Sequence, residues 1–445
     1  MNITVTAEEP KDNKVSAKLT VAAADVDKAI NKAYKDVAKK YNFQGFRRGK
    51  APRPVIDGMV GKETVLAQAT NDVLNAAEPL ALEQLDVTPV GQPSFGDEPA
   101  LLVEHADYVC ELSIEVRPAV ELESYDAPEV NLPPEEATEA EIQWQIDQLM
   151  SYQTTYEDTD EDREVAEGDI VNADVVNVEG AAHLSGEGRT LMLNGQQLQP
   201  EFQAGIIGMK KGETKDIEWT WSHESNGETK EHTFKVTVTL NAIKKAVTPE
   251  LNDELAKNVF GYDDVEAFKA AVKEEIESEK KRTLPELKED RVVEAMGSQV
   301  KLDEVPENYK NEIFNELAQE FLSQLQRQNV SLDMFLRARG IKSDDLIADL
   351  HTQADERARQ SLALDAVAAK MGFEASEDDV TNEFEKAGVS DVKASVEQWR
   401  SEGRLPAIRD SIKRTKALDW LVENAKVTIK DEVAERAAEK DSDAE

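Results

Sequence analysis

Glycine is spread unevenly along this 445-residue chain, and its distribution divides the sequence into segments that must fold differently. Eight of the 21 glycines fall within residues 168–212, whereas only six follow residue 249. Glycine favours tight turns and weakens helices, so the first segment suits short strands and the second suits long helices. We therefore expect domains of unlike secondary structure, about three at roughly 150 residues each.

Residues 1–118 combine strand and helix patterns. Val15–Val21 and Tyr108–Val116 alternate apolar with polar residues, as half-buried strands do. Cys110 lies on the apolar side of the second stretch, which predicts a core thiol rather than a nucleophile. The pattern between these strands predicts two helices, at residues 25–41 and 54–85, the second irregular at its two glycines.

Residues 28–53 carry positive charge in an otherwise acidic chain. The formal net charge is −39, yet this segment holds nine Lys or Arg and a single acid, Asp36. Such a concentration predicts a polyanionic partner that meets one small surface, and the alternative is a solvated basic face. Spacings of four, three and four residues place four lysines on one exposed helix face: Lys28, Lys32, Lys35 and Lys39.

The connection between the two predicted helices reads Gly-Phe-Arg-Arg-Gly-Lys-Ala-Pro over Gly45–Pro52. Its glycines permit left-handed turns, and its proline disfavours helix before it and favours a helix start after it. Phe46 is a large apolar residue at a loop tip, and the arginines beside it suit phosphate or carboxylate groups. We interpret the stretch as a docking loop; the alternative is that Phe46 plugs local space under the loop.

Residues 46–52 resemble the Phe-Arg-x-Gly-x-x-Pro ribosome-docking signature of the bacterial trigger factor family, with the usual glycine before it. The resemblance implies that the loop binds beside the nascent-chain exit of the large ribosomal subunit, contacting ribosomal RNA and a ribosomal protein. The four lysines would form the surface that approaches the RNA. The resemblance assigns ribosome binding to Gly45, Phe46, Arg47, Arg48, Gly49, Lys50 and Pro52.

Residues 119–164 are predicted to be an acidic linker followed by a helix. Residues 121–167 hold sixteen acids and one base, and such self-repelling charge keeps a connector extended. The helix is expected at 139–152, and the resemblance implies that it packs on the C-terminal domain. Its apolar face carries Ile142, Ile146 and Leu149.

Residues 165–245 predict a compact β-rich domain with short turns. Within it, Leu198–Glu213 resembles the FK506-binding-protein type of prolyl isomerase, a domain that trigger factors carry in this position. Rotation about a peptide bond, such as the one before proline, has a barrier of ~18–20 kcal/mol. Such a pocket lowers the barrier by binding the twisted amide better than the planar one. The resemblance makes Phe202 the pocket floor and associates Met209 and Trp221 with the pocket.

Several positions of this pocket depart from the family's pattern, which predicts weak or absent isomerase activity. Trp219 and Trp221 share one face of a predicted strand and would either restore the aromatic wall or belong to the core. The departures are Gln199 for an isoleucine, Glu201 for a glycine, His183-Leu184 near an aromatic–acid pair, and Val175 and Val236 near two wall aromatics.

Residues 246–432 are predicted to be helical and residues 433–445 to be a disordered acidic tail. Thr248-Pro249 predicts a helix start, and Ser376 with Asp379 predicts a capping box. Large apolar residues are too few for one globular core, so we expect an open assembly with exposed grooves, which the resemblance implies is a cradle for nascent chains. Helices are expected at 249–258, 263–299, 306–329, 332–339, 343–371, 376–387, 391–402 and 405–425.

Several classes of function lack their sequence signatures. The single cysteine fits a reducing compartment, and the absence of a signal-peptide pattern and of an 18-residue apolar run predicts a cytoplasmic protein. Scattered histidines predict no metal site. No phosphate-binding loop or nucleophile elbow occurs, so neither a cofactor nor ATP is expected.

These patterns predict an α+β multidomain protein with a small α+β N-terminal domain, a β-rich middle domain like that of FK506-binding proteins and an elongated all-α C-terminal domain. The predicted function is that of an ATP-independent, ribosome-associated chaperone for nascent or unfolded polypeptides. The alternatives are a folding enzyme that is primarily a prolyl isomerase and a holdase independent of the ribosome. The resemblance also leaves open a homodimer away from the ribosome.

Overall fold

The computed structural model divides into two compact units. The first contains residues 1–133 and 283–430, and the second contains residues 134–282 and 431–445. The N-terminal region and most of the C-terminal helices therefore share one unit. None of the described helices is long and apolar enough to cross a bilayer. The structure describes the chain except for residues 97, 160–162, 183, 194–197, 226–227 and 444–445.

An antiparallel sheet of three strands, in the order β1-β2-β3, underlies the N-terminal region. The inward-facing residues of β2 are buried, which confirms the predicted alternation. Asp12 and Asn13 have left-handed φ values of 51° and 59°, as a two-residue hairpin turn of this hand requires. The strands are β1 (Ile3–Ala7), β2 (Lys14–Val21) and β3 (Tyr108–Glu115).

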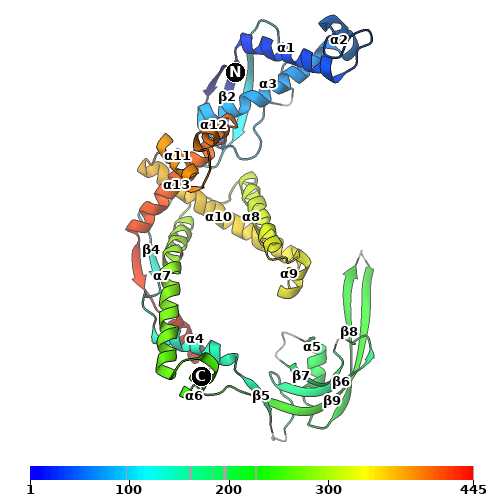
Figure 1. The fold of residues 1–445 in the computed structure, drawn as a ribbon, viewed down its shortest axis with the longest axis vertical. Coiled ribbons are helices and arrows are strands. Elements are labelled where there is room, and N and C mark those ends of the chain that lie inside the picture. The colour runs from blue at the N-terminus through cyan, green and yellow to red at the C-terminus, as the bar shows by residue number, and fades with distance from the viewer. Residues whose placement is uncertain (97, 160–162, 183, 194–197, 226–227, 444–445) are drawn as a thin grey trace. The chain divides into compact units, whose positions relative to one another are not determined.

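Three helices accompany this sheet and share its hydrophobic core (Figure 1). The prediction of one helix over 54–85 is wrong, because the chain breaks at Gly61, whose φ of +94° is one that other residues rarely adopt. The break lies at one of the two glycines where the sequence predicts an irregularity. The helices are α1 (Ala23–Lys40), α2 (Arg53–Val60) and α3 (Lys62–Leu85).

The later helices of this unit agree with their predicted ranges to within two residues. The capping box of α11 is confirmed: the amide of Asp379 donates to the hydroxyl of Ser376 at 3.2 Å, and the amide of Ser376 donates to the carboxylate of Asp379 at 2.9 Å. The helices are α8 (Glu307–Arg327), α9 (Leu332–Arg339), α10 (Ser343–Met371), α11 (Glu377–Lys386), α12 (Val392–Ser401) and α13 (Leu405–Asn424).

These helices bury their apolar residues in separate clusters rather than in one core. One cluster is closed by a short parallel pair of strands, β4 (Glu129–Leu132) and β10 (Lys426–Ile429). Small, separate cores agree with the open helical assembly that the scarcity of large apolar residues predicts.

The second unit contains the predicted β-rich domain. Its antiparallel sheet has the order β5-β9-β6-β7, and β8 pairs with β9. The far ends of β8 and β9 pair only with each other and extend past β6 and β7 as a two-stranded ribbon (Figure 1). The elements are β5 (Thr155–Asp158), β6 (Ile170–Glu179), β7 (Gly186–Met192), α5 (Pro200–Ile206), β8 (Thr214–Ser225) and β9 (Glu228–Val247).

Helix α4 (Glu139–Ser151) confirms the helix predicted over 139–152. Its Ile142 and Ile146 are buried against Phe268 of α7 (Val265–Gly297), so it packs on a helix far along the chain, as expected. A buried ion pair between Glu141 and Lys280 ties the same two helices together.

The predicted helix start at Thr248-Pro249 is wrong. Helix α6 (Asp253–Leu255) begins after Asn252, whose side chain accepts a hydrogen bond from the amide of Leu255 at 2.9 Å. Asparagine is a strong N-cap, and the acids that follow it suit the positive end of the helix. The chain continues as a π-helical turn, η1 (Ala256–Phe260).

The tail also differs from its prediction as a disordered segment, because helix α14 (Glu432–Asp443) occupies most of it. The carboxylate of Asp431 accepts a hydrogen bond from the amide of Ala434 at 3.0 Å, which starts the helix. Glu432 and Arg436 pair one turn apart at 4.0 Å. An N-cap and a helical pair thus favour a helix in a segment whose high charge predicts disorder.

Candidate functional site

The predicted docking loop, Gly45–Pro52, leaves α1 at its C-terminal end. Phe43, just before the loop, is buried in the N-terminal core. The amide of Phe46 donates to the carbonyl of Phe43 at 3.1 Å, so the chain turns sharply above this anchor. The side chain of Phe46 is 40% exposed. Phe43 is therefore the buried ring of this segment, and Phe46 is exposed at the tip rather than packed as a plug.

Two glycines give the loop its shape. Gly45 has a φ of +86° with open space around it, and Gly49 has a φ of +79°. A side chain at Gly49 would come within 3.3 Å of the Lys39 side chain. Between the glycines, the amide of Lys50 donates to the carbonyl of Arg47 at 2.9 Å. The left-handed conformation and this tight contact explain the sequence's use of glycine.

The loop also closes the end of α1. The last carbonyls of a helix lack partners within the helix and need donors from elsewhere. Here a cap residue and two loop residues supply them. The carbonyl oxygen of Val37 accepts from the amide of Tyr41 at 3.0 Å, and that of Ala38 accepts from the amide of Gly49 at 2.8 Å. The carbonyl oxygen of Lys39 accepts from the Nε of Arg48 at 2.6 Å.

The four predicted approach lysines lie exposed on α1 and form what we term the basic face: Lys28, Lys32, Lys35 and Lys39. Lys28 contacts Asp25 at 3.0 Å and Lys39 contacts Asp36 at 3.7 Å. The amide of Asn2 and the ammonium of Lys28 lower the pKa of Asp25. Exposed pairs of this kind bind weakly, so the lysines stay available to another anion.

Arg53 differs from the other cations of this segment because it is used by the fold. Its guanidinium contacts Glu104 and Asn31 and lies 4.6 Å from the centre of the Tyr34 ring. The Tyr34 hydroxyl donates to Asp57 at 2.6 Å, and burial together with this carboxylate raises the pKa of Tyr34 to about 12. These contacts fasten α2 to α1 at the base of the docking loop.

The residues predicted for the isomerase pocket lie mostly in the core of the β-rich domain. Phe202 is 0% exposed and Met209 is 1% exposed. Trp219 is 5% exposed, and its ring centre lies 5.4 Å from that of Phe202. Trp221 belongs to β8, but its side chain lies outside the described residues. The alternative that Trp219 is a core residue is the one that the structure supports.

Gln199, one of the departures from the isomerase pattern, has a structural partner. Its side-chain oxygen accepts a hydrogen bond from the indole nitrogen of Trp219, which stacks on Phe234 at 5.3 Å. Val175 and Val236, near the positions of two wall aromatics, are buried aliphatic residues. Leu184 packs at the edge of the same core, Glu201 is exposed on α5, and His183 lies outside the described residues.

A groove of about 530 Å³ lies among α8, α9 and α10. Phe321 and Phe335 line it edge to face, with ring centres 5.1 Å apart. Three large apolar side chains of the same helices are exposed: Leu322, Met334 and Ile347. The groove and the exposed side chains agree with the predicted open helical assembly with exposed grooves. Exposed apolar surface of this kind suits the binding of an unfolded chain.

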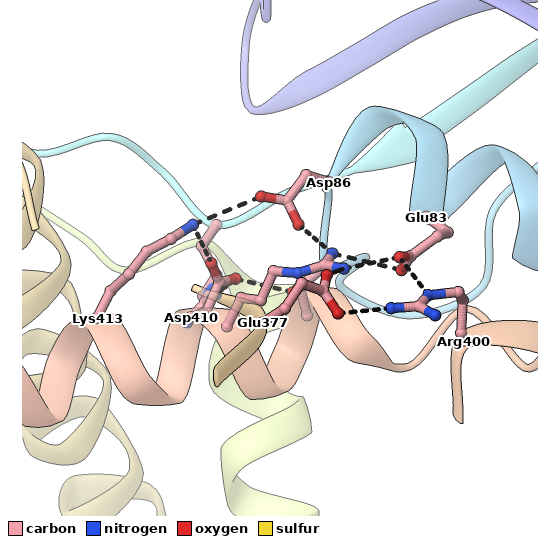
Figure 2. Close-up of polar contacts among 9 residues, drawn as sticks. Glu83, Asp86, Glu377, Arg400, Asp410 and Lys413 are labelled. Atoms are coloured by element: carbon pink, nitrogen blue, oxygen red, sulfur yellow. Dashed lines mark hydrogen bonds and ion pairs between the residues drawn. The ribbon is translucent and has the colours of Figure 1, made fainter. Parts of the chain in front are cut away.

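An ionic cluster that the sequence analysis missed joins the N-terminal region to the helices of the same unit (Figure 2). The guanidinium of Arg409 donates to Glu83 and to Asp86, both at 2.7 Å. Nearby, Gly403 lies so close to Pro79 that an added side chain would meet its backbone at 2.7 Å. The other members are Arg117, Glu377, Arg400, Asp410 and Lys413.

Sequence patterns give no signal for this cluster, because Arg409 and Glu83 are 326 positions apart. The docking loop, by contrast, is contiguous and stands out from its composition alone. The fold and the loop together define a multidomain protein with an exposed basic loop and helix face in its N-terminal region and exposed apolar side chains on later helices.

Comparison with known proteins identifies the family. Residues 1–149 match the model for bacterial trigger factor protein, and residues 264–423 match the model for its C-terminus. The trigger factor of Alkaliphilus metalliredigens (strain QYMF) is 32% identical over 428 residues, which cover 94% of this chain and 98% of the relative. The trigger factor of Lysinibacillus sphaericus (strain C3-41) is 31% identical over 428 residues, which cover 95% of this chain and 99% of the relative.

The chain therefore belongs to the trigger factor family. The relatives match it over nearly its whole length and support the function of a ribosome-associated chaperone. The family is also known for a prolyl isomerase domain. A solved structure of the trigger factor chaperone, from work on promiscuous substrate recognition in folding and assembly activities, aligns over 94% of this chain and 99% of that chain, at 18% identity and a TM-score of 0.40.

Proposed function

We propose that this protein docks at the nascent-chain exit of the large ribosomal subunit through Gly45–Pro52 and the basic face of α1. The observation that carries the proposal is the exposed tip: Phe46 and Arg47 face solvent on a loop that Phe43 and the end of α1 hold in place. An apolar ring beside a guanidinium suits a surface made of both protein and RNA.

The charge distribution supports docking through this tip alone. The chain carries a formal net charge of −39, so most of its surface is repelled by the phosphates of ribosomal RNA. The basic face is the exception, with four exposed lysines on one side of α1. Long-range repulsion and local attraction together would orient the protein before contact.

Co-sedimentation with purified ribosomes tests the docking. Reversing the charge of Arg47 and Arg48 to glutamate should abolish it at physiological salt. The matched control reverses Lys210 and Lys211, two adjacent exposed cations outside the loop, and changes the net charge equally. Unchanged co-sedimentation of the loop variant, or equal loss in the control, would refute docking through the loop.

The proposed clients are nascent or unfolded polypeptides in the cytoplasm, bound without ATP. The groove among α8, α9 and α10, with exposed Leu322 and Met334 beside it, supports this proposal. We assign one role to each predicted domain. Residues 1–118 bind the ribosome, residues 119–164 link the domains, residues 165–245 form the isomerase-like domain, and residues 246–432 hold clients. Suppression of aggregation of a denatured protein, measured without nucleotide, should persist in the loop variant.

Ribosome co-sedimentation, read together with the aggregation assay, separates the chaperone from a ribosome-independent holdase. Such a holdase would suppress aggregation but would not co-sediment with ribosomes, whether its loop is parental or charge-reversed. A homodimer away from the ribosome is a further assembly that the family resemblance allows. Sedimentation velocity at two protein concentrations tests it, and a concentration-independent monomer mass would exclude it.

We propose that prolyl isomerase activity is weak. Phe202 is fully buried beneath Trp219, and Val175 and Val236 supply no aromatic ring. A pocket with few aromatic side chains gains little from the twisted amide over the planar one. Refolding of a proline-limited substrate measures the activity. Turnover equal to that of a complete FK506-binding-protein domain would contradict this proposal and favour the enzyme as the main function.

A further inference from the structure

The two adjacent arginines of the docking loop have different surroundings. Arg48 directs its Nε to the carbonyl oxygen of Lys39, at 2.6 Å, on the last turn of α1. Arg47 is exposed, and no described residue hydrogen-bonds its guanidinium. Both arginines are exposed, but Arg48 bonds its own protein through its Nε, whereas Arg47 makes no such bond to a described residue.

The position of Arg48 is favourable for a cation that organises a helix end. The C-terminal end of a helix carries partial negative charge and unpaired carbonyls, so a guanidinium there gains both a hydrogen bond and a charge–dipole contact. The neighbouring amide, of Gly49, bonds the preceding carbonyl, of Ala38, at 2.8 Å. Two consecutive loop residues thus clamp the loop to two consecutive carbonyls of α1.

The clamp holds the loop backbone close to the end of α1. Gly49 reaches Ala38 with a φ of +79°, and its Cα lies so close to Lys39 that a Cβ would be 3.3 Å from that side chain. If the Arg48 bond were lost, the loop would keep only one of its two contacts with the helix end. Phe46 and Arg47 lie between this clamp and the hydrogen bond from the Phe46 amide to Phe43, so losing the Arg48 contact would release one end of the tip.

We propose that Arg48 is a positioning residue, which holds the loop on the end of α1, and that Arg47 is the charge that contacts the ribosome. The inference rests on the proposed docking function and assigns different roles to two residues of the same motif. A pre-ordered loop binds more tightly because less conformational freedom is lost on contact.

Side-chain replacements can separate the hydrogen bond of Arg48 from its charge. Glutamine carries its Nε2 amide at the same number of bonds from Cα as the Nε of arginine, so Arg48→Gln keeps a donor for Lys39 and removes the charge. Arg48→Met has a similar length but no donor. Arg47→Gln is the matched control, since it removes the same charge one residue away.

Two measurements on the full chain test the proposal. Affinity for purified large ribosomal subunits is measured across salt concentrations, and exchange of the Gly49 amide is measured on the free protein. We expect Arg47→Gln to bind about tenfold more weakly and to lower the salt slope by about 0.7–0.9, as loss of one phosphate contact does. Arg48→Gln should bind nearly as the parent does.

Arg48→Met should bind roughly three- to tenfold more weakly with an unchanged salt slope, and its Gly49 amide should exchange faster by a similar factor. The proposal is overturned if Arg48→Gln matches Arg47→Gln in affinity and slope, or if Arg48→Met leaves Gly49 exchange unchanged. Docking itself fails separately, if the charge-reversed loop still co-sediments, and the exchange measurement then still decides the role of Arg48.

Discussion

The ionic cluster of Figure 2 makes a prediction about coupling between Arg409 and Glu83. Their side chains are 13% and 17% exposed, and the guanidinium of Arg409 donates to Glu83 at 2.7 Å. Replacing Arg409 by methionine or Glu83 by glutamine should loosen the contact of α3 with α13. The double variant should be less destabilised than the sum of the two single variants, because each single change removes the Arg409–Glu83 interaction, while Arg409→Met also removes the bond to Asp86.

The magnitude follows from the geometry. Two unit charges about 4 Å apart attract by about 4 kcal/mol at an effective dielectric constant of about 20, and desolvation offsets much of this attraction. Exposed pairs retain about 0.2–1 kcal/mol, whereas hydrogen bonds to charged groups in less exposed sites retain about 1.5–3 kcal/mol. We therefore expect a coupling free energy of about 1.5 kcal/mol, equivalent to roughly tenfold in a local opening equilibrium.

Amide hydrogen exchange in the last turn of α3 and the first turns of α13 measures this equilibrium for the parent, the two single variants and the double variant. The control cycle uses Arg404 and Glu402, which pair at 3.3 Å with exposures of 55% and 39%. Their coupling should stay below about 0.5 kcal/mol. The reasoning fails if the two cycles give equal coupling, or if the effects at Arg409 and Glu83 simply add.

Three further predictions concern single positions. Gly403→Ala should speed amide exchange in both α3 and α12, because its Cβ would lie 2.7 Å from the backbone of Pro79; exchange equal to the parent's would show that the contact is dispensable. The Lys416 ammonium and the Ser376 amide and hydroxyl lower the pKa of Asp379, so its stabilising effect is complete above the unfolded pKa of about 4 and is lost as pH falls below that value. The difference in urea midpoint between the parent and Asp379→Asn should therefore shrink from about pH 6 to about pH 3, and a constant difference would contradict the assigned cause. Burial raises the pKa of Cys110 to about 11, so alkylation near pH 8 should be roughly 100-fold slower in the folded protein than in urea, and equal rates would exclude a half-buried thiol.

Local sequence patterns were sufficient for most of the secondary structure. The helices from α8 to α13 lie within two residues of their predicted ranges, because caps and apolar periodicity act over a few residues. The same short-range reasoning located the turn glycines of the docking loop, whose φ values of +86° and +79° few other residues adopt. It failed at Thr248-Pro249 and in the tail, where a nearby Asn252 and Asp431 supply stronger caps.

Other features depend on which distant segments meet. Nothing in the local pattern around Arg48 distinguishes it from Arg47, yet only Arg48 reaches the carbonyl of Lys39. Trp219 fits a pocket wall or a core equally well by its strand position. Its burial on Phe202 and its bond to Gln199 make it a core residue.

The amino-acid sequence alone determined the types of segment, the boundaries of helices α8 to α13 to within two residues and the basic loop, since backbone preferences and local charge are properties of neighbouring residues. Tertiary packing decided that the N-terminal region shares a unit with residues 283–430 and that Arg409 pairs with Glu83. Pairing between charges 326 positions apart requires two particular surfaces to meet and exclude water. No local sequence pattern encodes this ion pair, because the pair contributes its free energy only once the helices that carry it have packed.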